Sequence, residues 1–600
     1  MASSLLSLTP FLFGRKLKIA AKVSQRCRDT AVSVGSTKTS VSSAERRSAN
    51  YLPCLYDDDL QLLRSDFKGD EYVRQVEELK GRVKMMLNNM EGDQLEMIDN
   101  LLRLGVAYHF EDDIHNILGN IYNNNQVKKD NLYATALEFR ILREHGYLSS
   151  PGNAEFVYHR FPGESIMEEA WNFTSKHLGN VEIDQVDPFL GIQVSQALEL
   201  PLHWRMPRLE ARWYIDLYER RADFDPIVLQ LAKLDFNVLQ GLHQEELKEM
   251  SMYKQHLIGF HVLQLGCIQR WWKNTGLGEK LSFARNRLVE SFLWTVGMAS
   301  KPQFGSCRKI LTKVVAFITV IDDIYDVYGT LDELELFTDA VERLWHLYHM
   351  QALLLSRRVF INSLLISTCF RWDIKAMEQL PDYMKICFFA LYNAVNEMAY
   401  DILKDQGHDV VFNLKNAWAE LLRAYLLEAR WYHSGYTPSF DEYSKNAWIS
   451  VATPLMAVHS SLFVRNQINQ KELEFLESYP EFLYWSALIV RLQDDLGTSS
   501  EELKRGDVAK SIQCYMHENR SVSEEAGRGH IKNLVREAWK QLNVEGEAAS
   551  PLSKEVSGTL LNLVRGSHCF YQHGDGHGSQ GQNHLTKQHA MSLLFHPVPL

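Results

Sequence analysis

Apolar positions recur at three- and four-residue spacing along most of the chain. The pattern is regular in four stretches, Tyr72–Met90, Leu132–His145, Ile227–Leu242 and Tyr383–Leu403. Residues three and four apart lie on one face of a helix, so this spacing predicts amphipathic α-helices. Period-two alternation, which is typical of strands, is scarce. We therefore expect an all-α fold.

A charged run at residues 219–223 separates two parts of this helical pattern, and a new apolar helix follows it. The chain has 600 residues, and domains usually hold about 100–200, so we expect more than one domain. We predict two helical domains, 46–222 and 223–600. No repeat of the 20–50-residue periods typical of solenoids is evident.

Composition and net charge limit the kinds of molecule that the protein is expected to bind. The chain is 46% hydrophobic and 23% charged, which is ordinary for a globular protein, and its net charge is −11. This acidic balance argues against nucleic-acid binding. Its eight cysteines form no Cys-x-x-Cys pair, which argues against a zinc site and a disulfide framework. No apolar run reaches the roughly 20 residues that a membrane span needs.

The first 45 residues differ from the rest. They are rich in Ser, Thr and Ala, they carry several Lys and Arg residues, and Asp29 is their only acid before Glu45. This composition is typical of an organelle transit peptide. The alternative is a disordered tail.

Three carboxylates follow an apolar helix near the middle of the chain. Val314–Ile321 is apolar apart from Thr319, and Asp322 and Asp323 follow at once. Asp326 comes four residues after Asp322, so on a helix these two share a face, with Asp323 turned about 100° away. The three would repel one another unless a cation lay between them, and their oxygens suit Mg²⁺. The alternative is an acidic helix end in water.

A second oxygen-bearing cluster lies within Leu492–Glu502. Asp494, Thr498 and Glu502 are four residues apart, and therefore form one stripe along a helix. Gly497, between them, allows a close approach by another element. Taken alone, the cluster could be a solvated acidic face. Two such clusters, each after an apolar helix, favour a pair of metal sites.

Basic residues near both clusters could bind an anionic ligand. Arg285 and Arg287 precede the first cluster, and Arg491 and Lys510 bracket the second. Guanidinium groups match phosphate oxygens well. Any one of the four alone is more often a surface residue. Together with the clusters, they predict a phosphate-bearing ligand held between two Mg²⁺ sites beside an apolar cavity.

From about Arg46 to the C-terminus, the chain resembles plant class I terpene synthases of the plastidial monoterpene synthase type. The combination of motifs is specific, although no single one is. The matching motifs are DDIYD (322–326), the second metal motif (Asp494, Thr498, Glu502), Arg-x-Arg (285–287), the tandem arginines Arg46-Arg47 followed by SANYLP, LEFRILREHGY (137–147) and YQHGDGHG (571–578).

The resemblance implies a relict N-terminal α-barrel without catalytic residues and a C-terminal class I helical bundle. It implies geranyl diphosphate as substrate, three Mg²⁺ ions with Mn²⁺ as a possible substitute, and a monomer or weak homodimer in the plastid stroma. No Asp-x-Asp-Asp motif of protonation-initiated cyclases occurs in the N-terminal part. The implied metal ligands are Asp322, Asp323, Asp326, Asp494, Thr498 and Glu502; the diphosphate contacts are Arg285, Arg287, Arg491 and Lys510; and the lid residues are Arg46 and Arg47.

Ionising an allylic diphosphate requires a neutralised leaving group and an apolar pocket that keeps water from the cation. Asp322, Asp326 and Arg287 would serve the ionisation. Aromatic faces stabilise cations, and Trp294, about two turns after Arg287, is the candidate, with a core tryptophan as the alternative. Tyr571 could help to close the mouth of the site.

Four places depart from the family pattern. Apolar stretches at 252–269 and 344–371 interrupt it, the stretch from Tyr147 to Gly163 is short, and Tyr56 stands where the tandem-arginine motif ends in Trp. We hypothesise that the stretches are translated introns and the short segment a skipped exon, since surface insertions are normally polar. Genuine loop insertions are the alternative, and a transcript encoding both stretches would exclude the intron hypothesis.

Two other functions remain open. A prenyl chain-elongating transferase also pairs two acidic clusters, but normally with aspartates in both, whereas the second here has Thr498 and Glu502. An inactive relic, or a misannotated gene model, is the other alternative. The product could be an olefin or an alcohol, cyclic or acyclic. We expect a helix break facing the pocket within Asn446–Pro454.

Overall fold

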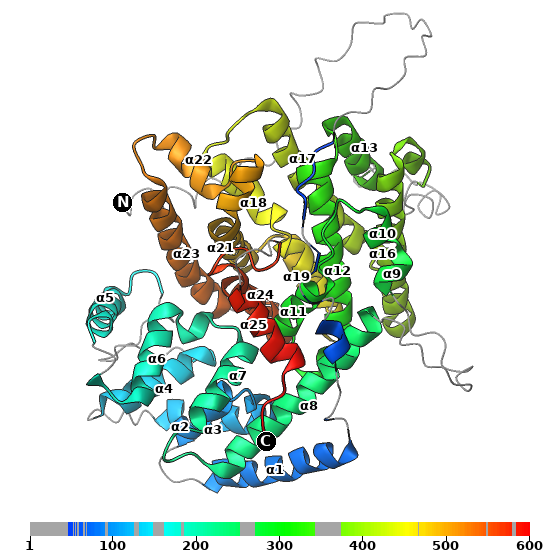
Figure 1. Cartoon of the computed structure of the whole chain (residues 1–600). Coiled ribbons are helices and arrows are strands. Elements are labelled where there is room, and N and C mark those ends of the chain that lie inside the picture. Colours follow the sequence, from blue (N-terminus) through cyan, green and yellow to red (C-terminus); the bar gives the residue numbers. More distant parts are fainter. Residues whose placement is uncertain are drawn as a thin grey trace, which may run out of the picture. The chain divides into compact units, whose positions relative to one another are not determined.

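The computed structural model describes residues 46–600, with gaps at 52, 55, 57–58, 64–66, 68, 90–93, 125–130, 148–160, 182–184, 252–270, 343–373, 466, 548–549 and 579–583. Residues 47–600 form one compact unit. Every regular element in the described ranges is a helix (Figure 1). The prediction of an all-α fold is confirmed.

Helices of the N-terminal part are mostly short. Their bounds are η1 Asp59–Leu62, α1 Asp70–Asn89, α2 Gln94–Arg103, η2 Ala107–His109, α3 Glu111–Asn124, α4 Leu132–Glu144, α5 Ser165–Gly179, α6 Pro188–Glu199, η4 Leu202–Trp204 and α7 Pro207–Tyr218.

The C-terminal part contains the longer helices. Their bounds are α8 Pro226–Ser251, α9 Trp271–Thr275, α10 Leu277–Lys280, α11 Leu288–Met298, η5 Pro302–Phe304, α12 Gly305–Asp323, η6 Ile324–Tyr328, α13 Leu331–Glu342, η7 Ile374–Gln379, α16 Asp382–Gln406, α17 Val411–Ser434, α18 Phe440–Ser450, α19 Thr453–Phe463, α20 Gln470–Glu477, α21 Glu481–Arg505, α22 Ser511–Glu518, α23 Glu524–Glu547, α24 Lys554–Tyr571, α25 His584–Ala590 and η8 Met591–Phe595.

The four stretches with helical spacing correspond to α1, α4, α8 and α16. Their ends differ from the predicted ones by at most three residues, except that α8 continues nine residues beyond Leu242. Side-chain caps fix several helix starts. Ser439 and Glu442 form a reciprocal capping box at the start of α18, and Ser553 accepts a hydrogen bond from Val556 N at the start of α24. Such caps satisfy the free N–H groups of a first helical turn.

A bundle of helices in the C-terminal part surrounds the candidate site. α21 packs against α23 and α24, α11 against α12 and α24, and α17 against α18 and α19. In Figure 1, α11, α12, α19, α21 and α24 lie together in the middle of the unit. Large buried side chains such as Phe292, Phe317 and Trp418 fill the space between them. Polar residues that line the cavity are therefore held by closely packed apolar helices.

The predicted boundary at 222/223 falls between α7, which ends at Tyr218, and α8, which begins at Pro226. α8 also packs against α1 and α7, and residues 47–600 form one compact unit. The division into 46–222 and 223–600 therefore stays a prediction. None of the described helices is long and apolar enough to cross a bilayer.

The departures from the family pattern lie mostly outside the described residues. This holds for the apolar stretches 252–269 and 344–371, and for most of the segment between Tyr147 and Gly163. Tyr56 is described. Its side chain is buried and stacks on Phe595, with ring centroids 6.5 Å apart and planes 5° from parallel. It therefore occupies an aromatic core position.

Candidate active site

One cavity of about 150 Å³ collects most of the residues that the sequence singled out. Its apolar wall comes mainly from α11, α12, α19 and α24. Its polar lining includes Arg285, Asp322, Asp326, Arg491, Asp494, Thr498, Glu502 and Lys510, together with Trp294 and Tyr571. The two acidic clusters, 168 or more residues apart in sequence, thus face one another across a single cavity.

The first acidic cluster lies where α12 changes to a π-helical turn. Gly329 N donates to the carbonyl of Ile324, five residues earlier, at 2.8 Å. Such turns are rare and often occur at functional sites. Asp322 and Asp326 both line the cavity, as their spacing predicted. Burial and then the neighbouring Asp322 raise the pKa of Asp326 well above its usual range.

Asp323 is not among the residues that line the cavity. It is fully buried, and its Oδ2 accepts a hydrogen bond from the backbone N of Arg285 at 2.7 Å. The Arg285 guanidinium lies 2.8 Å from Asp323 Oδ1 and 2.7 Å from Asp322 Oδ2. Asp323 therefore holds Arg285 against the cluster, a contact that the sequence pattern did not reveal.

The second cluster lies on α21, and all three of its members line the same cavity. Burial raises the pKa of Asp494 to about 7, against the opposing effect of Arg491. Thr498 Oγ1 and Glu502 Oε2 are buried and accept no hydrogen bond from the described residues. Buried polar atoms normally have partners. These oxygen atoms are therefore available to a ligand.

Two cations lie beside the second cluster. Arg491 Nη1 donates to Asp494 Oδ2 at 2.9 Å, and Lys510 Nζ lies 3.8 Å from Glu502 Oε2. Lys510 is buried, yet the carboxylates of Glu502, Asp326 and Glu428 together raise its pKa. Both side chains are therefore charged and stand at the cavity wall, where they can bind an anion.

The donor set fits divalent cations shared with an anionic ligand. No three His, Cys, Asp or Glu side chains in the described ranges converge into a complete metal cage. Mg²⁺ commonly uses one or two carboxylates and takes its other oxygens from water and substrate phosphates. The buried oxygens of Thr498 and Glu502 that accept no hydrogen bond from the described residues, and the raised pKa of Asp326, agree with that mode of binding.

Arg287 does not line the cavity, although it was predicted to contact diphosphate. Its Nε donates to the carbonyl of His577 at 3.1 Å, and its Nη2 donates to the carbonyl of Gly578 at 3.0 Å. Arg287 thus anchors the segment that follows α24. That segment contributes Asp575, His577 and Gly578 to the cavity.

Both predicted aromatic residues reach the cavity. Trp294 stacks on Phe570, with ring centroids 4.1 Å apart and planes 3° from parallel. Trp294 is therefore both a packed core side chain and part of the cavity wall. Burial and then Asp494, its hydrogen-bond partner, raise the pKa of Tyr571 far above its usual range. Tyr571 thus remains a neutral hydroxyl beside the second cluster.

An N-terminal segment, residues 47–51, joins the edges of the two clusters. Arg47 Nη1 donates to the carbonyl of Asp326 at 2.9 Å, and its Nη2 lies 3.0 Å from Asp507 Oδ1. The Tyr51 ring lies 4.7 Å from the guanidinium of Arg285 and 5.9 Å from that of Arg505. The lid role of Arg47 stays a prediction. Arg46 lies outside the compact unit of residues 47–600.

Sequence reasoning missed several cavity residues, among them His577 and Glu428. His577 Nε2 lies 3.0 Å from Thr319 Oγ1, whose hydroxyl donates to the carbonyl of Val315. Burial lowers the pKa of His577 to about 3, so the ring is neutral. His577 belongs to the YQHGDGHG stretch and could have been singled out there. Glu428 stands in no motif.

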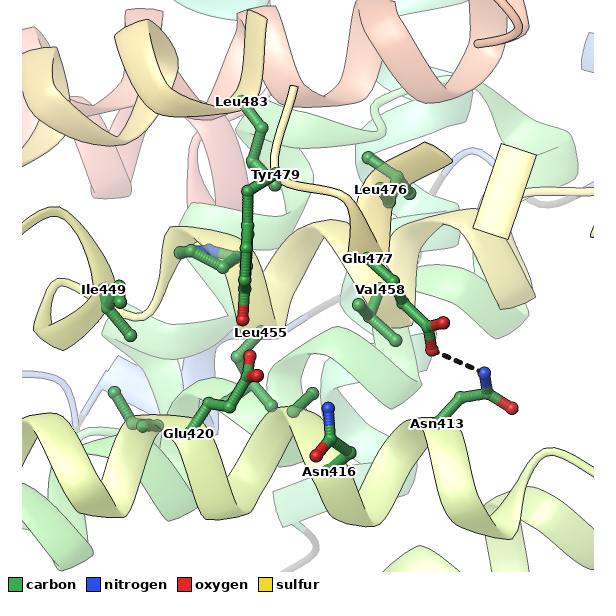
Figure 2. A pocket seen from close by; sticks show the side chains of 13 residues that line it. Asn413, Asn416, Glu420, Ile449, Leu455, Val458, Leu476, Glu477, Tyr479 and Leu483 are labelled. Atoms are coloured by element: carbon green, nitrogen blue, oxygen red, sulfur yellow. Dashed lines mark hydrogen bonds between the residues drawn. The ribbon is translucent and has the colours of Figure 1, made fainter. Parts of the chain in front are cut away.

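A second cavity lies between α17, α19 and α20 (Figure 2). Its volume is about 30 Å³, which suits one or two water molecules but no larger ligand. Asn413 Nδ2 donates to Glu477 Oε1 across it at 2.6 Å. This cavity is therefore not a second candidate active site.

Gly497 lies where α21 meets α24, as the close approach predicted at this position requires. An added Cβ would lie 2.9 Å from both the Cβ and the carbonyl oxygen of Tyr571. We expect Gly497→Ala to lower the free energy of unfolding by about 1–3 kcal/mol, because overpacking shifts the two helices. Thermal unfolding of the metal-free protein measures this.

Gly558→Ala on α24 is the control, since its added Cβ would meet nothing within 4 Å. Helix propensity predicts for it an unchanged stability or a gain of up to about 1 kcal/mol. Equal melting temperatures for the two variants would contradict the proposed close packing at Gly497.

Comparisons with known proteins agree with this geometry. Residues 273–541 match the terpene synthase family, metal binding domain, and residues 55–152 match the terpene synthase N-terminal domain. The (-)-alpha-terpineol synthase of Vitis vinifera is 46% identical over 640 aligned residues, which cover 100% of this chain and 99% of that relative. The chloroplastic myrcene synthase of Quercus ilex is 46% identical over 92% of this chain and 90% of that relative.

Two solved structures are also similar. Limonene synthase with 2-fluorolinalyl diphosphate has a TM-score of 0.81 and 38% identity, covering 92% of this chain and 100% of that one. Isoprene synthase from grey poplar leaves, in complex with three Mg²⁺ ions and dimethylallyl-S-thiolodiphosphate, has a TM-score of 0.76 and 38% identity, covering 89% and 99%. Sequence, fold and cavity agree, and the chain belongs to the plant terpene synthase family, of the monoterpene synthase type, whose members are lyases acting on prenyl diphosphates.

Proposed function

We propose that this protein converts geranyl diphosphate into a monoterpene olefin or alcohol and releases diphosphate in a Mg²⁺-dependent reaction. The observation that carries the proposal is the single cavity that two acidic clusters, four Arg and Lys side chains and an apolar wall line together. The monoterpene synthases among its relatives support the ten-carbon substrate.

The polar end of the cavity would bind the diphosphate and three Mg²⁺ ions, with Mn²⁺ as a possible substitute. Asp322 and Asp326 would hold metal on one side, and Asp494, Thr498 and Glu502 on the other. Bound Mg²⁺ would act as a Lewis acid that neutralises the leaving diphosphate. Arg285, Arg491 and Lys510 would contact the diphosphate oxygens directly and orient the scissile carbon–oxygen bond toward the apolar wall.

Asp323 and Arg287 would act through other residues. Asp323 binds the backbone and lies beside the guanidinium of Arg285, so we assign it to the orientation of Arg285 and not to direct metal binding. Arg287 holds the carbonyls of His577 and Gly578, so we assign it to the orientation of the segment that carries them.

The apolar wall would receive the prenyl chain and the allylic cation. Val315, Ile318, Met456 and Leu563 line this part of the cavity, with Trp294 beside them. Apolar side chains exclude water, which would otherwise capture the cation at random. The aromatic face of Trp294 would stabilise positive charge, and Tyr571 would narrow the mouth of the cavity beside Asp494.

The test uses purified protein that begins at Arg46, incubated with geranyl diphosphate and Mg²⁺ and followed by analysis of volatile products. We expect C10 terpenes, released diphosphate and no turnover with EDTA. Parallel reactions contain farnesyl diphosphate, or geranyl plus isopentenyl diphosphate. Longer prenyl diphosphates would show a chain-elongating transferase, and the absence of any product would support the relic.

We further propose that the protein works in the plastid stroma. The basic, acid-poor composition of residues 1–45 and several relatives named chloroplastic support plastid targeting. A fluorescent protein carrying residues 1–45 should accumulate inside plastids, and cytosolic fluorescence would contradict the proposal.

A further inference from the structure

Two buried carboxylates at the cavity, Glu428 and Asp575, belong to neither acidic cluster. Glu428 lies on α17, has only 3% of its surface exposed, and lines the cavity. A negative charge beside a diphosphate site repels the anion and would weaken its binding. A buried charge also needs partners that compensate for its lost hydration. The partners of Glu428 indicate its role.

Glu428 is bound to the last turn of α18. Its Oε1 accepts hydrogen bonds from Asn446 Nδ2, at 3.1 Å, and from Ser450 Oγ. Arg491 holds the same turn from the other side: its Nη2 donates to Ser450 Oγ at 3.4 Å, and its Nε donates to the carbonyl of Ala447 at 3.3 Å. The Ser450 hydroxyl thus links Glu428 to Arg491, and Arg491 donates in turn to Asp494.

The helix breaks directly after this turn. α18 ends at Ser450, α19 begins at Thr453, and Ala452 between them has a φ of 62°, in the left-handed region. That conformation is costly for a residue other than glycine and persists only where its surroundings impose it. Residues 450–453 and Met456 line the cavity. The predicted helix break is confirmed, and its position sets part of the outline of the cavity.

We propose that Glu428 is a positioning residue that fixes the break between α18 and α19 and, through Ser450, the guanidinium of Arg491. The inference rests on the proposed function of the cavity and deepens it. Glu428 and Ser450 would keep Arg491, at the diphosphate end of the cavity, in a fixed position relative to the α18–α19 break, at its hydrocarbon end. The fate of the prenyl cation, and hence the product ratio, would depend on this pair of residues.

The alternative role for Glu428 is direct metal binding. The dependence of activity on Mg²⁺ concentration distinguishes a positioning role from metal binding. A positioning residue leaves the Mg²⁺ concentration for half-maximal activity unchanged within about twofold. Loss of a metal ligand or of its immediate support typically costs about 10–100-fold in metal affinity. Glu428→Gln keeps the size and one acceptor oxygen, whereas Ser450→Ala removes only the linking hydroxyl.

The control is Glu472→Gln. Glu472 is equally buried, accepts hydrogen bonds from Ser553 N at 2.7 Å and Ser553 Oγ at 3.0 Å, and pairs with Arg465. It does not line the cavity. Loss of a buried carboxylate there would lower the melting temperature without any change in products, which is the outcome of a merely structural role.

We expect Glu428→Gln and Ser450→Ala each to change the ratio of the main product to the next by about fivefold, equivalent to about 1 kcal/mol between competing barriers. Glu472→Gln should give the wild-type ratio. Unchanged ratios in both cavity variants, or a tenfold higher Mg²⁺ requirement, would overturn the proposal. If Glu428→Gln does not fold, Ser450→Ala decides alone.

Pyrophosphate binding tests the role of Glu428 independently of the proposed function, because it requires no turnover. If the wild type turns over no prenyl diphosphate, the proposed function fails, and calorimetry with inorganic pyrophosphate and Mg²⁺ then tests Glu428. We expect about fivefold weaker pyrophosphate binding in Glu428→Gln and Ser450→Ala, because Arg491 loses its fixed orientation, and wild-type binding in Glu472→Gln. Equal binding in all variants would refute the positioning role.

Discussion

Alanine at Asp322 should lower kcat/KM for geranyl diphosphate by at least about 10³-fold, or about 4 kcal/mol of transition-state stabilisation. Asp322 lines the cavity and faces the second cluster, and its Oδ2 accepts a hydrogen bond from Arg285 Nη2 at 2.7 Å. The substitution removes a proposed metal ligand and one partner of Arg285 together. Diphosphate release measured against substrate concentration gives kcat and KM separately.

Asp332→Asn provides the matched control, since Asp332 is an exposed acid on α13, ten positions from Asp322 in sequence. It should retain wild-type kinetics. Asp322→Ala should also need at least about tenfold more Mg²⁺ for its residual activity. Full activity of Asp322→Ala would refute the assignment of the first cluster to metal binding.

The sequence predicted those features that depend on local spacing. Asp494, Thr498 and Glu502 repeat every four residues, and the helix places all three on one cavity wall. Asp322 and Asp326 meet the same cavity even though a π-helical turn replaces the ideal helix between them. The spacing of the proposed metal ligands could therefore be predicted, because it follows from helix geometry alone.

Contacts between distant segments could not be read in this way. Asp323 and Arg287 carry the same chemical groups as their neighbours in the motifs, but Asp323 binds Arg285 and Arg287 binds the segment after α24. Glu428 belongs to no sequence motif. Its proposed role depends on contacts with residues of α18 and α21, and only tertiary packing brings those helices close to it. A local pattern gives the type of group, whereas packing decides what that group touches.

The contacts of Arg47 could not be predicted from the sequence either, although the tandem-arginine motif identified its segment. The tandem-arginine motif predicted a lid but not its contacts. Arg47 bonds to the carbonyls of Asp326 and Arg505 and to the carboxylate of Asp507. It thereby joins the end of the first cluster to the loop that follows the second. Closing an active site excludes water and strengthens the electrostatic interactions inside it.

Arg47→Ala should therefore lower kcat by about 10–100-fold, equivalent to about 1.4–2.7 kcal/mol, as expected for the loss of charge-assisted hydrogen bonds. The share of hydroxylated acyclic products should rise, because water can then reach the allylic cation. Product analysis and diphosphate release measure both effects. Arg430→Ala, which removes an exposed arginine paired with Glu335, is the control and should match the wild type.

Asp507→Asn tests the same contact from its other side. Because Asp507 Oδ1 is the ionic partner of Arg47, the two substitutions should be less than additive when combined, with a coupling of about 0.5–3 kcal/mol. Full additivity would mean that the two residues act independently. An unchanged product profile in Arg47→Ala would mean that residues 47–51 do not shield the cation, and the mouth of the cavity would then be closed by other residues, with Tyr571 the next to test.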